Sequence, residues 1–277
     1  MSTRIAVLLT VYNRRATTLA CLRALYAQSL PMDHELVVYL VDDGSTDGTT
    51  AAVNAAFPEV KVIPGDGNLF WCNGMRLAWQ HAARSKPDFY LWLNDDTMLL
   101  PGAVMLLLDS HKQACQTGTD AVIVVGACRD PLSGKRSYAG KVRPGAHPLI
   151  LRDLEPTGQI QTCDTFQGNC ILVCNLVYER VGTLDTYQHG FGDIDYGYRA
   201  GAAACAIFMT PEYVAECVDN PCPSYWYKGH SRRERWRLLN SRKGMPPTDW
   251  YKFVRRHCGW KWLLFWPRPY LRVILNR

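Results

Sequence analysis

The chain has 277 residues, of which 48% are hydrophobic and 20% charged, so it is long enough to bury a core without disulfide or metal staples. No apolar run reaches the roughly eighteen residues that a membrane-spanning helix needs. The net charge of +6 is unevenly spread, because residues 228–277 hold fourteen Lys and Arg against two acids, whereas residues 1–227 hold seventeen against twenty-three.

The first residues and the cysteines bear on the cellular compartment. An apolar strand-like run begins at Ile5 without a basic stretch and a long apolar segment before it, so we expect no signal peptide. The eleven cysteines are scattered and form no Cys-x-x-Cys pair suited to zinc. An odd number of cysteines without an export signal favours reduced, mostly buried thiols in the cytoplasm over a disulfide framework.

The first half of the chain alternates between strand and helix patterns. Continuous apolar runs predict buried strands over residues 4–12, 35–41, 60–63 and 89–93. Helical spacing of apolar residues predicts helices over residues 14–28, 48–57, 72–85 and 101–115. Such alternation implies a parallel sheet whose strand ends meet at one rim.

The second half is less regular. Residues 121–127 form another apolar run, and residues 129–162 are rich in Gly, Pro and charge, which predicts loops or an antiparallel excursion. A strand over 171–174 and a short helix over 175–181 follow. Residues 195–203 are predicted to be helical, with acids at the helix start that the helix dipole favours.

Three polar clusters interrupt these elements. Asp42-Asp43-Gly44-Ser45 follows the second strand, Asn94-Asp95-Asp96 ends the fourth, and Gly192-Asp193-Ile194-Asp195 with Arg199 opens the late helix. Ligands bind at the carboxyl ends of strands in open α/β sheets, and adjacent carboxylates there suit Mg²⁺ or Mn²⁺. The alternative for the pair at 95–96 is a solvated turn.

Together with Thr10-Val11-Tyr12-Asn13, these clusters resemble, in order and spacing, the family 2 glycosyltransferases over residues 4–215. The resemblance implies a GT-A fold, which is a Rossmann-like α/β fold with a mixed, mainly parallel sheet flanked by helices. It also implies an inverting enzyme that moves a sugar from a nucleotide diphosphate to an acceptor hydroxyl. The Asn-x-Asp form of the metal motif is similar to the branch that contains many bacterial rhamnosyltransferases, whose donor is dTDP-rhamnose.

The resemblance assigns the chemistry to two carboxylates. Asp193 matches the family's general base, which removes the proton of the acceptor hydroxyl and contributes about 10² to 10⁴ in rate. The acid that usually precedes this base is Gly192 here. Asp96 matches the metal-binding carboxylate, but Asn94 replaces the first carboxylate of the motif. The implied dependence on Mg²⁺ or Mn²⁺ is therefore weakened, because binding would rest on fewer charges or on diphosphate oxygens.

The donor nucleotide would lie across the first strands. Asp42 would accept the N3 proton of uracil or thymine, and Asp43 would reach the ribose. The alternative for Asp42 is a helix N-cap cluster with the neighbouring hydroxyl residues. The donor-binding residues implied by the resemblance are Thr10, Tyr12, Asn13, Arg14, Asp42, Asp43, Asn68, Asn73, Asn94, Asp95 and Arg199.

The acceptor site would lie beside the catalytic motif. The residues implied there are Trp71, Gly168, Asn169 and Asp195. A Trp at a helix start is more often part of the core. Asp195 has an alternative as well, in which it caps the helix and pairs with Arg199.

We divide the chain into a GT-A domain over residues 1–225 and a basic, Trp-rich helical extension over residues 226–277. Basic and aromatic residues alternate at helical spacing over 232–237 and 251–265, as in segments that lie on an anionic membrane surface. The alternative is a solvated basic face whose Trp residues pack on the core. Nucleic acid is not expected as a partner, because no binding motif accompanies the charge.

These features predict a cytoplasmic glycosyltransferase, peripheral to a bacterial inner membrane. Its donor would be a pyrimidine nucleotide sugar, either dTDP-rhamnose or a UDP-sugar. Its acceptor would be a hydroxyl of a lipid-linked or lipopolysaccharide-type glycan. A sugar-nucleotide nucleotidyltransferase is disfavoured, because residues 10–15 hold no glycine for a phosphate loop. A non-catalytic membrane-surface binding protein is the other alternative, and a homodimer stays open.

Overall fold

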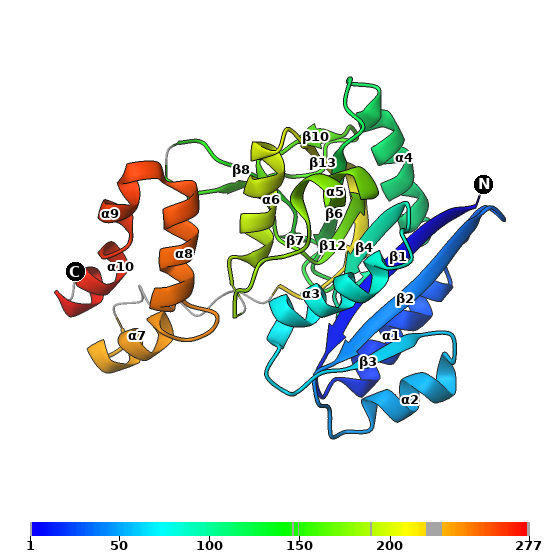
Figure 1. Cartoon of the computed structure of the whole chain (residues 1–277), viewed down its shortest axis with the longest axis horizontal. Coiled ribbons are helices and arrows are strands. Elements are labelled where there is room, and N and C mark those ends of the chain that lie inside the picture. The colour runs from blue at the N-terminus through cyan, green and yellow to red at the C-terminus, as the bar shows by residue number, and fades with distance from the viewer. Residues whose placement is uncertain (1, 146, 149, 189, 220–228, 276–277) are drawn as a thin grey trace.

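The computed structural model describes residues 2–145, 147–148, 150–188, 190–219 and 229–275. Its first half alternates strands with helices in chain order, as predicted (Figure 1). The strands are β1 (Thr3–Val11), β2 (His34–Asp42), β3 (Lys61–Pro64) and β4 (Phe89–Leu93). The helices are α1 (Arg15–Tyr26), α2 (Thr49–Ala56), α3 (Phe70–Ala83) and α4 (Ala103–Cys115).

One large sheet organises the molecule. Its strand order is β10-β13-β6-β12-β4-β1-β2-β3, with β5 paired to β13 and β7 to β6. The pairs of β1 with β2 and β4 are parallel, whereas β12 runs antiparallel to β4 and β6. The fold is therefore α/β, with a mixed, mostly parallel sheet flanked by helices.

The later elements follow the predicted order with additions. They are β5 (Met98–Leu99), β6 (Val122–Arg129), β7 (Arg136–Tyr138), β8 (Gly140–Val142), β9 (Arg152–Asp153), β10 (Gln161–Thr162), β11 (Thr165–Phe166), β12 (Cys170–Cys174), α5 (Asn175–Val181), α6 (Gly192–Ala202) and β13 (Ala206–Glu216). Strand β13 was not expected from the sequence. It contains Pro211 and its register with β6 shifts between Met209 and Ala215, so it lacks the uninterrupted apolar run of a buried strand.

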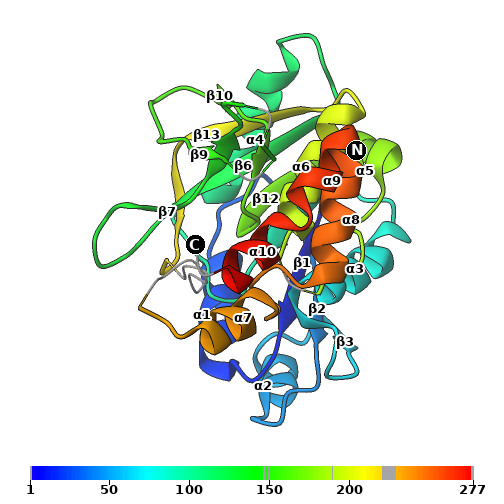
Figure 2. The ribbon, with the colours of Figure 1, turned by 90° about the vertical axis from the view of Figure 1, so that its left-hand side faces the viewer.

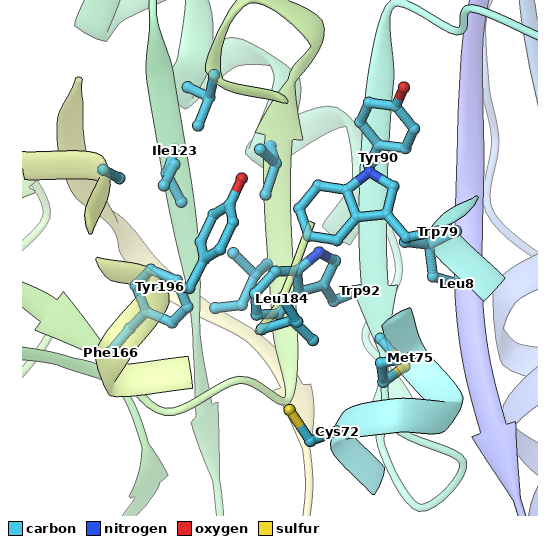
Figure 3. Packing of buried hydrophobic residues seen from close by; sticks show 14 of the residues in the cluster. Leu8, Cys72, Met75, Trp79, Tyr90, Trp92, Ile123, Phe166, Leu184 and Tyr196 are labelled. Carbon is cyan, nitrogen blue, oxygen red and sulfur yellow. The ribbon is translucent and has the colours of Figure 1, made fainter. Parts of the chain in front are cut away.

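An aromatic cluster fixes α6 against the sheet (Figure 3). Trp79 of α3, Trp92 of β4 and Tyr196 of α6 are fully buried. The ring centroids of Trp92 and Tyr196 lie 5.2 Å apart, and those of Trp79 and Trp92 lie 5.3 Å apart. Aromatic pairs at this spacing add to the stabilisation from their buried area. The first turn of α6, which contains Asp193, is thereby held at the rim of the sheet.

The C-terminal helices lie beside α6, away from β3 and α2 (Figures 1 and 2). They are α7 (Arg232–Leu239), α8 (Pro247–His257), the 3₁₀ turn η1 (Gly259–Lys261), α9 (Trp262–Phe265) and α10 (Arg268–Ile274). Helix α7 starts with a capping box, in which the Ser231 hydroxyl accepts from the Glu234 N–H and the Glu234 carboxylate accepts from the Ser231 N–H. The predicted boundary at 225–226 lies outside the described residues.

Helix α8 packs on the main domain. Its Trp250, Phe253 and Val254 are buried in the same apolar cluster as Trp79 and Trp92. By contrast, Trp260 has 70% of its surface exposed. The alternative reading of the extension, in which Trp residues pack on the core, therefore holds for Trp250 and not for Trp260.

Two findings bear on the expected compartment without deciding it. No helix in the described part of the chain combines the length and apolar character needed to cross a membrane. The ten cysteines among the described residues are free, and seven of them are buried.

Candidate active site

A cavity of about 1090 Å³ opens at the carboxyl ends of β1, β2 and β4. Most of the residues singled out in the sequence line it. These are Thr10, Tyr12, Arg14, Asp43, Asn68, Trp71, Asn94, Asp95, Asp96, Gly168, Asn169 and Asp193. The remaining predicted residues, which are absent from this lining, are Asn13, Asp42, Asn73, Asp195 and Arg199.

Asp43 shapes the glycine-rich loop at the edge of the cavity that follows β2. Its two carboxylate oxygens accept hydrogen bonds of 2.9 Å from the backbone N–H groups of Gly67 and Phe70. A Cβ on Gly65 would lie 2.7 Å from Asp43 Oδ1, so only glycine allows the loop to approach this closely. Each oxygen keeps a lone pair that a ligand hydroxyl could reach.

Asp42 and Asn13 hold loops rather than face the cavity. Asp42 accepts a 2.8 Å hydrogen bond from the Ser45 N–H and another from the Thr50 hydroxyl. The N-cap alternative does not hold for Asp42, because the N-cap of α2 is Gly48 and has no side-chain cap hydrogen bond. Asn13 has φ of 51° and its Oδ1 accepts from the Thr46 N–H at 2.7 Å. The Asn13 bond joins the turn after β1 to the turn after β2, which fixes this part of the rim.

Asn94 is committed to a hydrogen-bond network below the acidic pair. Its Oδ1 accepts from Trp71 Nε1 at 2.7 Å, and its Nδ2 donates to Asn169 Oδ1 at 3.1 Å. A carboxylate could accept from Trp71 but could not donate to Asn169. The amide at position 94 therefore ties the acidic pair to the loop before β12. Asn73, in the first turn of α3, does not line the cavity, and its side chain donates to the Tyr187 carbonyl at 3.3 Å.

Asp95 and Asp96 both form an ion pair with the Arg14 side chain. Arg14 Nη1 lies 2.8 Å from Asp95 Oδ1, and Arg14 Nη2 lies 2.9 Å from Asp96 Oδ2. Burial raises the pKa of Asp95 to about 6, a shift that Arg14 opposes and Asp96 reinforces. Asp95 Oδ2 is buried and has no hydrogen-bond partner, whereas the Asp96 side chain is 30% exposed toward solvent.

The family implied by the motifs uses a divalent metal, and the donor set fits one in part. Carboxylate oxygens are the ligands that Mg²⁺ and Mn²⁺ prefer. Within the described residues, however, no group of three or more His, Cys, Asp or Glu side chains could hold a metal ion. The protein would therefore share the ion with ligand oxygens, and Asp96 is the carboxylate exposed to do so.

Asp193 sits at the first turn of α6 with its carboxylate oriented by backbone groups. Oδ2 accepts from the Gly168 N–H at 3.0 Å, and Oδ1 accepts from the Ile194 N–H at 2.8 Å. Burial raises the pKa of Asp193, although these two N–H groups act in the opposite direction. A carboxylate with a raised pKa is a better proton acceptor, which is the property that a general base requires.

Gly168 permits the close approach of this loop. A Cβ at position 168 would lie 3.3 Å from Asp193 Cβ and 3.3 Å from ring atoms of Trp71 and Trp92. Gly168, which the resemblance assigns to the acceptor site, thus leaves room for the side chain of Asp193.

The Asp195 side chain lies outside the cavity and has no exposed surface. It accepts from Arg199 Nε, Arg256 Nη1 and His257 Nε2 at 2.8 Å each, and from the Tyr187 hydroxyl at 3.0 Å. The pairing of Asp195 with Arg199 agrees with the alternative interpretation, whereas the capping part does not, because the N-cap of α6 is Phe191 and has no side-chain cap hydrogen bond. Neither Asp195 nor Arg199 lines the cavity, so neither side chain is in place for the direct substrate contact that the resemblance implied.

The C-terminal helix α8 also supports the residues just before Asp193. Phe191 has φ of 68°, a left-handed conformation that is costly for a bulky residue. Its ring stacks on Phe253 with 5.0 Å between centroids and on Trp250 with 5.7 Å. The strained turn is therefore stabilised by the segment that the sequence presents as a separate extension.

Sequence reasoning missed part of the cavity wall. Lys141 lines it from the irregular region, Gln167 lines it from the loop before β12, and the turn 242–245 lines it from the C-terminal segment. The Arg242 guanidinium lies 3.6 Å from the centroid of the Phe70 ring. The basic charge of that turn was visible in the sequence, but its position over the cavity depends on the packing of α7 and α8.

This fold and this cavity define a class of protein: a glycosyltransferase of GT-A fold. The model of glycosyl transferase family 2 matches residues 6–169. The chain belongs to this family.

Two known proteins are informative comparisons, one in sequence and one in fold. The chain is 26% identical over 266 residues to the N-acetylglucosaminyl-diphospho-decaprenol L-rhamnosyltransferase of Mycobacterium tuberculosis, covering 86% of this chain and 81% of the relative. The same figures hold for that enzyme in a second strain, H37Rv. Among solved structures, the mannosyltransferase PcManGT of Pyrobaculum calidifontis in complex with GDP-Man and Mn²⁺ aligns with a TM-score of 0.58 and 18% identity, covering 99% of this chain and 74% of that chain.

Proposed function

We propose that this glycosyltransferase moves a sugar, with rhamnose from dTDP-rhamnose as the leading candidate, to a hydroxyl of a lipid-linked acceptor at a membrane surface. The observation that carries the proposal is that Asp43, Asp96 and Asp193 line one cavity. The rhamnosyltransferase relative supports the sugar and the lipid-linked acceptor, since the alignment covers 86% of this chain.

In the proposed reaction, the Asp193 carboxylate accepts the proton of the acceptor hydroxyl as that oxygen attacks the anomeric carbon. The bond between this carbon and the diphosphate breaks, and the nucleoside diphosphate leaves. The Gly168 and Ile194 N–H groups hold the carboxylate in place for the attack. Single displacement from one face inverts the anomeric configuration.

The donor would lie between Asp43 and the acidic pair. Asp43 and Asn68 would contact the nucleoside, and Tyr12, with 55% of its surface exposed, lines the same cavity. Asp96 would hold Mg²⁺ or Mn²⁺ together with the diphosphate, and this cation would offset the charge of the leaving group. The binding of Mn²⁺ and GDP-Man by the mannosyltransferase neighbour is consistent with such a site.

The acceptor's lipid would meet the C-terminal helices. Their exposed apolar side chains include Trp260, Leu263, Leu264, Leu271 and Ile274. Arg255, Lys261 and Arg268 are exposed in the same segment. Apolar side chains mixed with cations are typical of helices that lie on an anionic membrane, where each basic residue contributes about 1 kcal/mol.

A thermal-shift screen tests the donor. UDP-, dTDP- and GDP-sugars would be compared with and without Mn²⁺, because a ligand specific for the folded state raises the melting temperature. We expect the largest shift with dTDP-rhamnose plus Mn²⁺, followed by transfer to a lipid-linked N-acetylglucosamine diphosphate. No shift with any nucleotide sugar would refute the proposed donor class.

Vesicle co-sedimentation tests the membrane contact. The full chain should bind vesicles that contain phosphatidylglycerol and should bind neutral vesicles weakly. The triple change Trp260→Ser, Leu263→Ser, Leu264→Ser should abolish binding. The matched control Leu132→Ser removes an apolar side chain that is 91% exposed on the main domain, and it should have no effect. Equal binding by the triple variant would exclude these helices as the membrane contact.

A further inference from the structure

One side chain bridges both carboxylates of the metal motif. Arg14 precedes α1 and follows Asn13, whose left-handed backbone is pinned by hydrogen bonds with Ser45 and Thr46. From this fixed turn, the guanidinium reaches Asp95 at 2.8 Å and Asp96 at 2.9 Å. Such charge-assisted hydrogen bonds are about twice as strong as neutral ones.

The oxygens that Arg14 holds are those a divalent cation would need. The other oxygen of Asp95 is buried, and the other oxygen of Asp96 lies 3.7 Å from Cys217 Sγ. A cation that binds Asp95 Oδ1 or Asp96 Oδ2 therefore meets the guanidinium that already contacts both oxygens. A divalent cation on these oxygens would lie close to the guanidinium, and the repulsion between the two positive charges opposes keeping both sets of contacts.

We propose that Arg14 is a built-in competitor for the divalent cation, which gives up the two carboxylates and turns onto the donor diphosphate when cation and nucleotide bind together. The inference rests on the proposed function, since it takes a nucleoside diphosphate as ligand. It makes Arg14 a positioning cation for the diphosphate, and it makes binding of metal and nucleotide mutually dependent.

Charge explains why the two ligands would enter together. With both carboxylates ionised, Asp95, Asp96 and Arg14 carry one net negative charge, which repels a diphosphate. A divalent cation reverses the sign to one net positive charge, and the released guanidinium can then bind two phosphate oxygens with its planar donor fork. The Arg14 side chain is 45% exposed and also borders a second hollow, of about 350 Å³, beside Asp96. It therefore has room to move.

Binding of Mn²⁺, followed by electron paramagnetic resonance of the free ion at pH 8, tests the proposal without turnover. We expect wild-type protein to bind Mn²⁺ weakly alone and more tightly when dTDP or UDP is present. Arg14→Gln should bind Mn²⁺ alone about tenfold more tightly than wild type, while its affinity for the nucleotide falls. Arg15→Gln is the matched control, because Arg15 is the next residue and its side chain does not line the cavity. It should behave as wild type.

Arg14→Lys keeps the charge without the planar fork and should give an intermediate Mn²⁺ affinity, which provides a second readout if Arg14→Gln unfolds. Unchanged or weaker Mn²⁺ binding by both variants would overturn the proposed competition by Arg14. If the wild type still transferred sugar, the proposed function would stand. Failure of the wild type to bind dTDP or UDP with Mn²⁺ would instead reject the proposed function.

Discussion

Replacing Asp195 by Asn separates a positioning role from a substrate contact. The carboxylate has no exposed surface and accepts hydrogen bonds from Arg199, Arg256, His257 and Tyr187. The change removes the charge that compensates the surrounding cations. Breaking a buried ion pair in this way costs about 3–5 kcal/mol, a large part of a typical folding free energy.

The pH dependence of the unfolding free energy gives a second measure of the contribution of Asp195. Burial alone would raise the pKa of Asp195, but the hydrogen bond from His257 and the charges of Arg199 and Arg256 lower it to about 2. A lowered carboxylate pKa stabilises the folded state above the unfolded value of 3.8, and this stabilisation is lost as pH falls through about 2. The corresponding difference is about 2 kcal/mol. The gap in stability between wild type and Asp195→Asn should therefore narrow from about pH 4 toward pH 2.

Urea unfolding followed by Trp fluorescence measures both effects. The control is Glu35→Gln, because the Arg4–Glu35 pair spans 3.0 Å between side chains that are about half exposed and should contribute less than about 1 kcal/mol. An Asp195→Asn protein with unchanged unfolding free energy and a raised KM for the acceptor would show that Asp195 touches substrate, and would refute the reasoning.

Three further outcomes follow from the geometry around Asp193. Burial raises the pKa of Asp193, and only its ionised form accepts a proton, so kcat/KM should begin to fall with acid at a pH above 3.8, the ordinary pKa of an Asp side chain. A fall in kcat/KM that begins only at or below pH 3.8 would contradict the role of Asp193 as the base. Gly168→Ala should lower kcat and leave donor affinity by calorimetry unchanged, since the new Cβ would lie 3.3 Å from Asp193 Cβ; Gly201→Ala, with open space around it, should keep full activity. Phe253→Ala should lower the unfolding free energy by about 3–5 kcal/mol and should also lower kcat, because its ring supports the strained Phe191; loss of stability with unchanged kcat would show that the stack does not position the base.

Much of the fold was predictable because buried strands appear in the sequence as continuous apolar runs. The apolar runs before Asn13, Asp43 and Asn94 correspond to β1, β2 and β4, and proline and glycine marked the intervening turns. Strand β13 escaped prediction because Pro211 and its register shifts break the pattern on which such predictions rest.

The site was predictable as a set of motifs, less so as individual contacts. Chain order predicted that Asp43 and Asp96 share one rim, because the carboxyl ends of parallel strands converge, and the resemblance added Asn169. The sequence could not show that the Asp195 carboxylate binds other side chains of the protein, because two of these partners lie about 60 residues later in the chain, in α8. Polar residues of one motif look alike until their hydrogen-bond partners are known.

The C-terminal segment shows the same limit. Its basic and aromatic residues predicted amphipathic helices, and helices are present. That α8 buries Trp250 against the domain and that the turn after α7 lines the cavity depend on tertiary contacts, which local periodicity does not record.

The central claim is that Asp193 removes the proton of the acceptor hydroxyl. The most direct measurement compares donor affinity and initial rate of transfer for Asp193→Asn, using dTDP-rhamnose and a lipid-linked N-acetylglucosamine diphosphate, with the exposed Asp164→Asn as control. The account predicts a fall in kcat of about 10² to 10⁴ with donor affinity nearly unchanged, and no effect of the control. Full turnover by Asp193→Asn would contradict it.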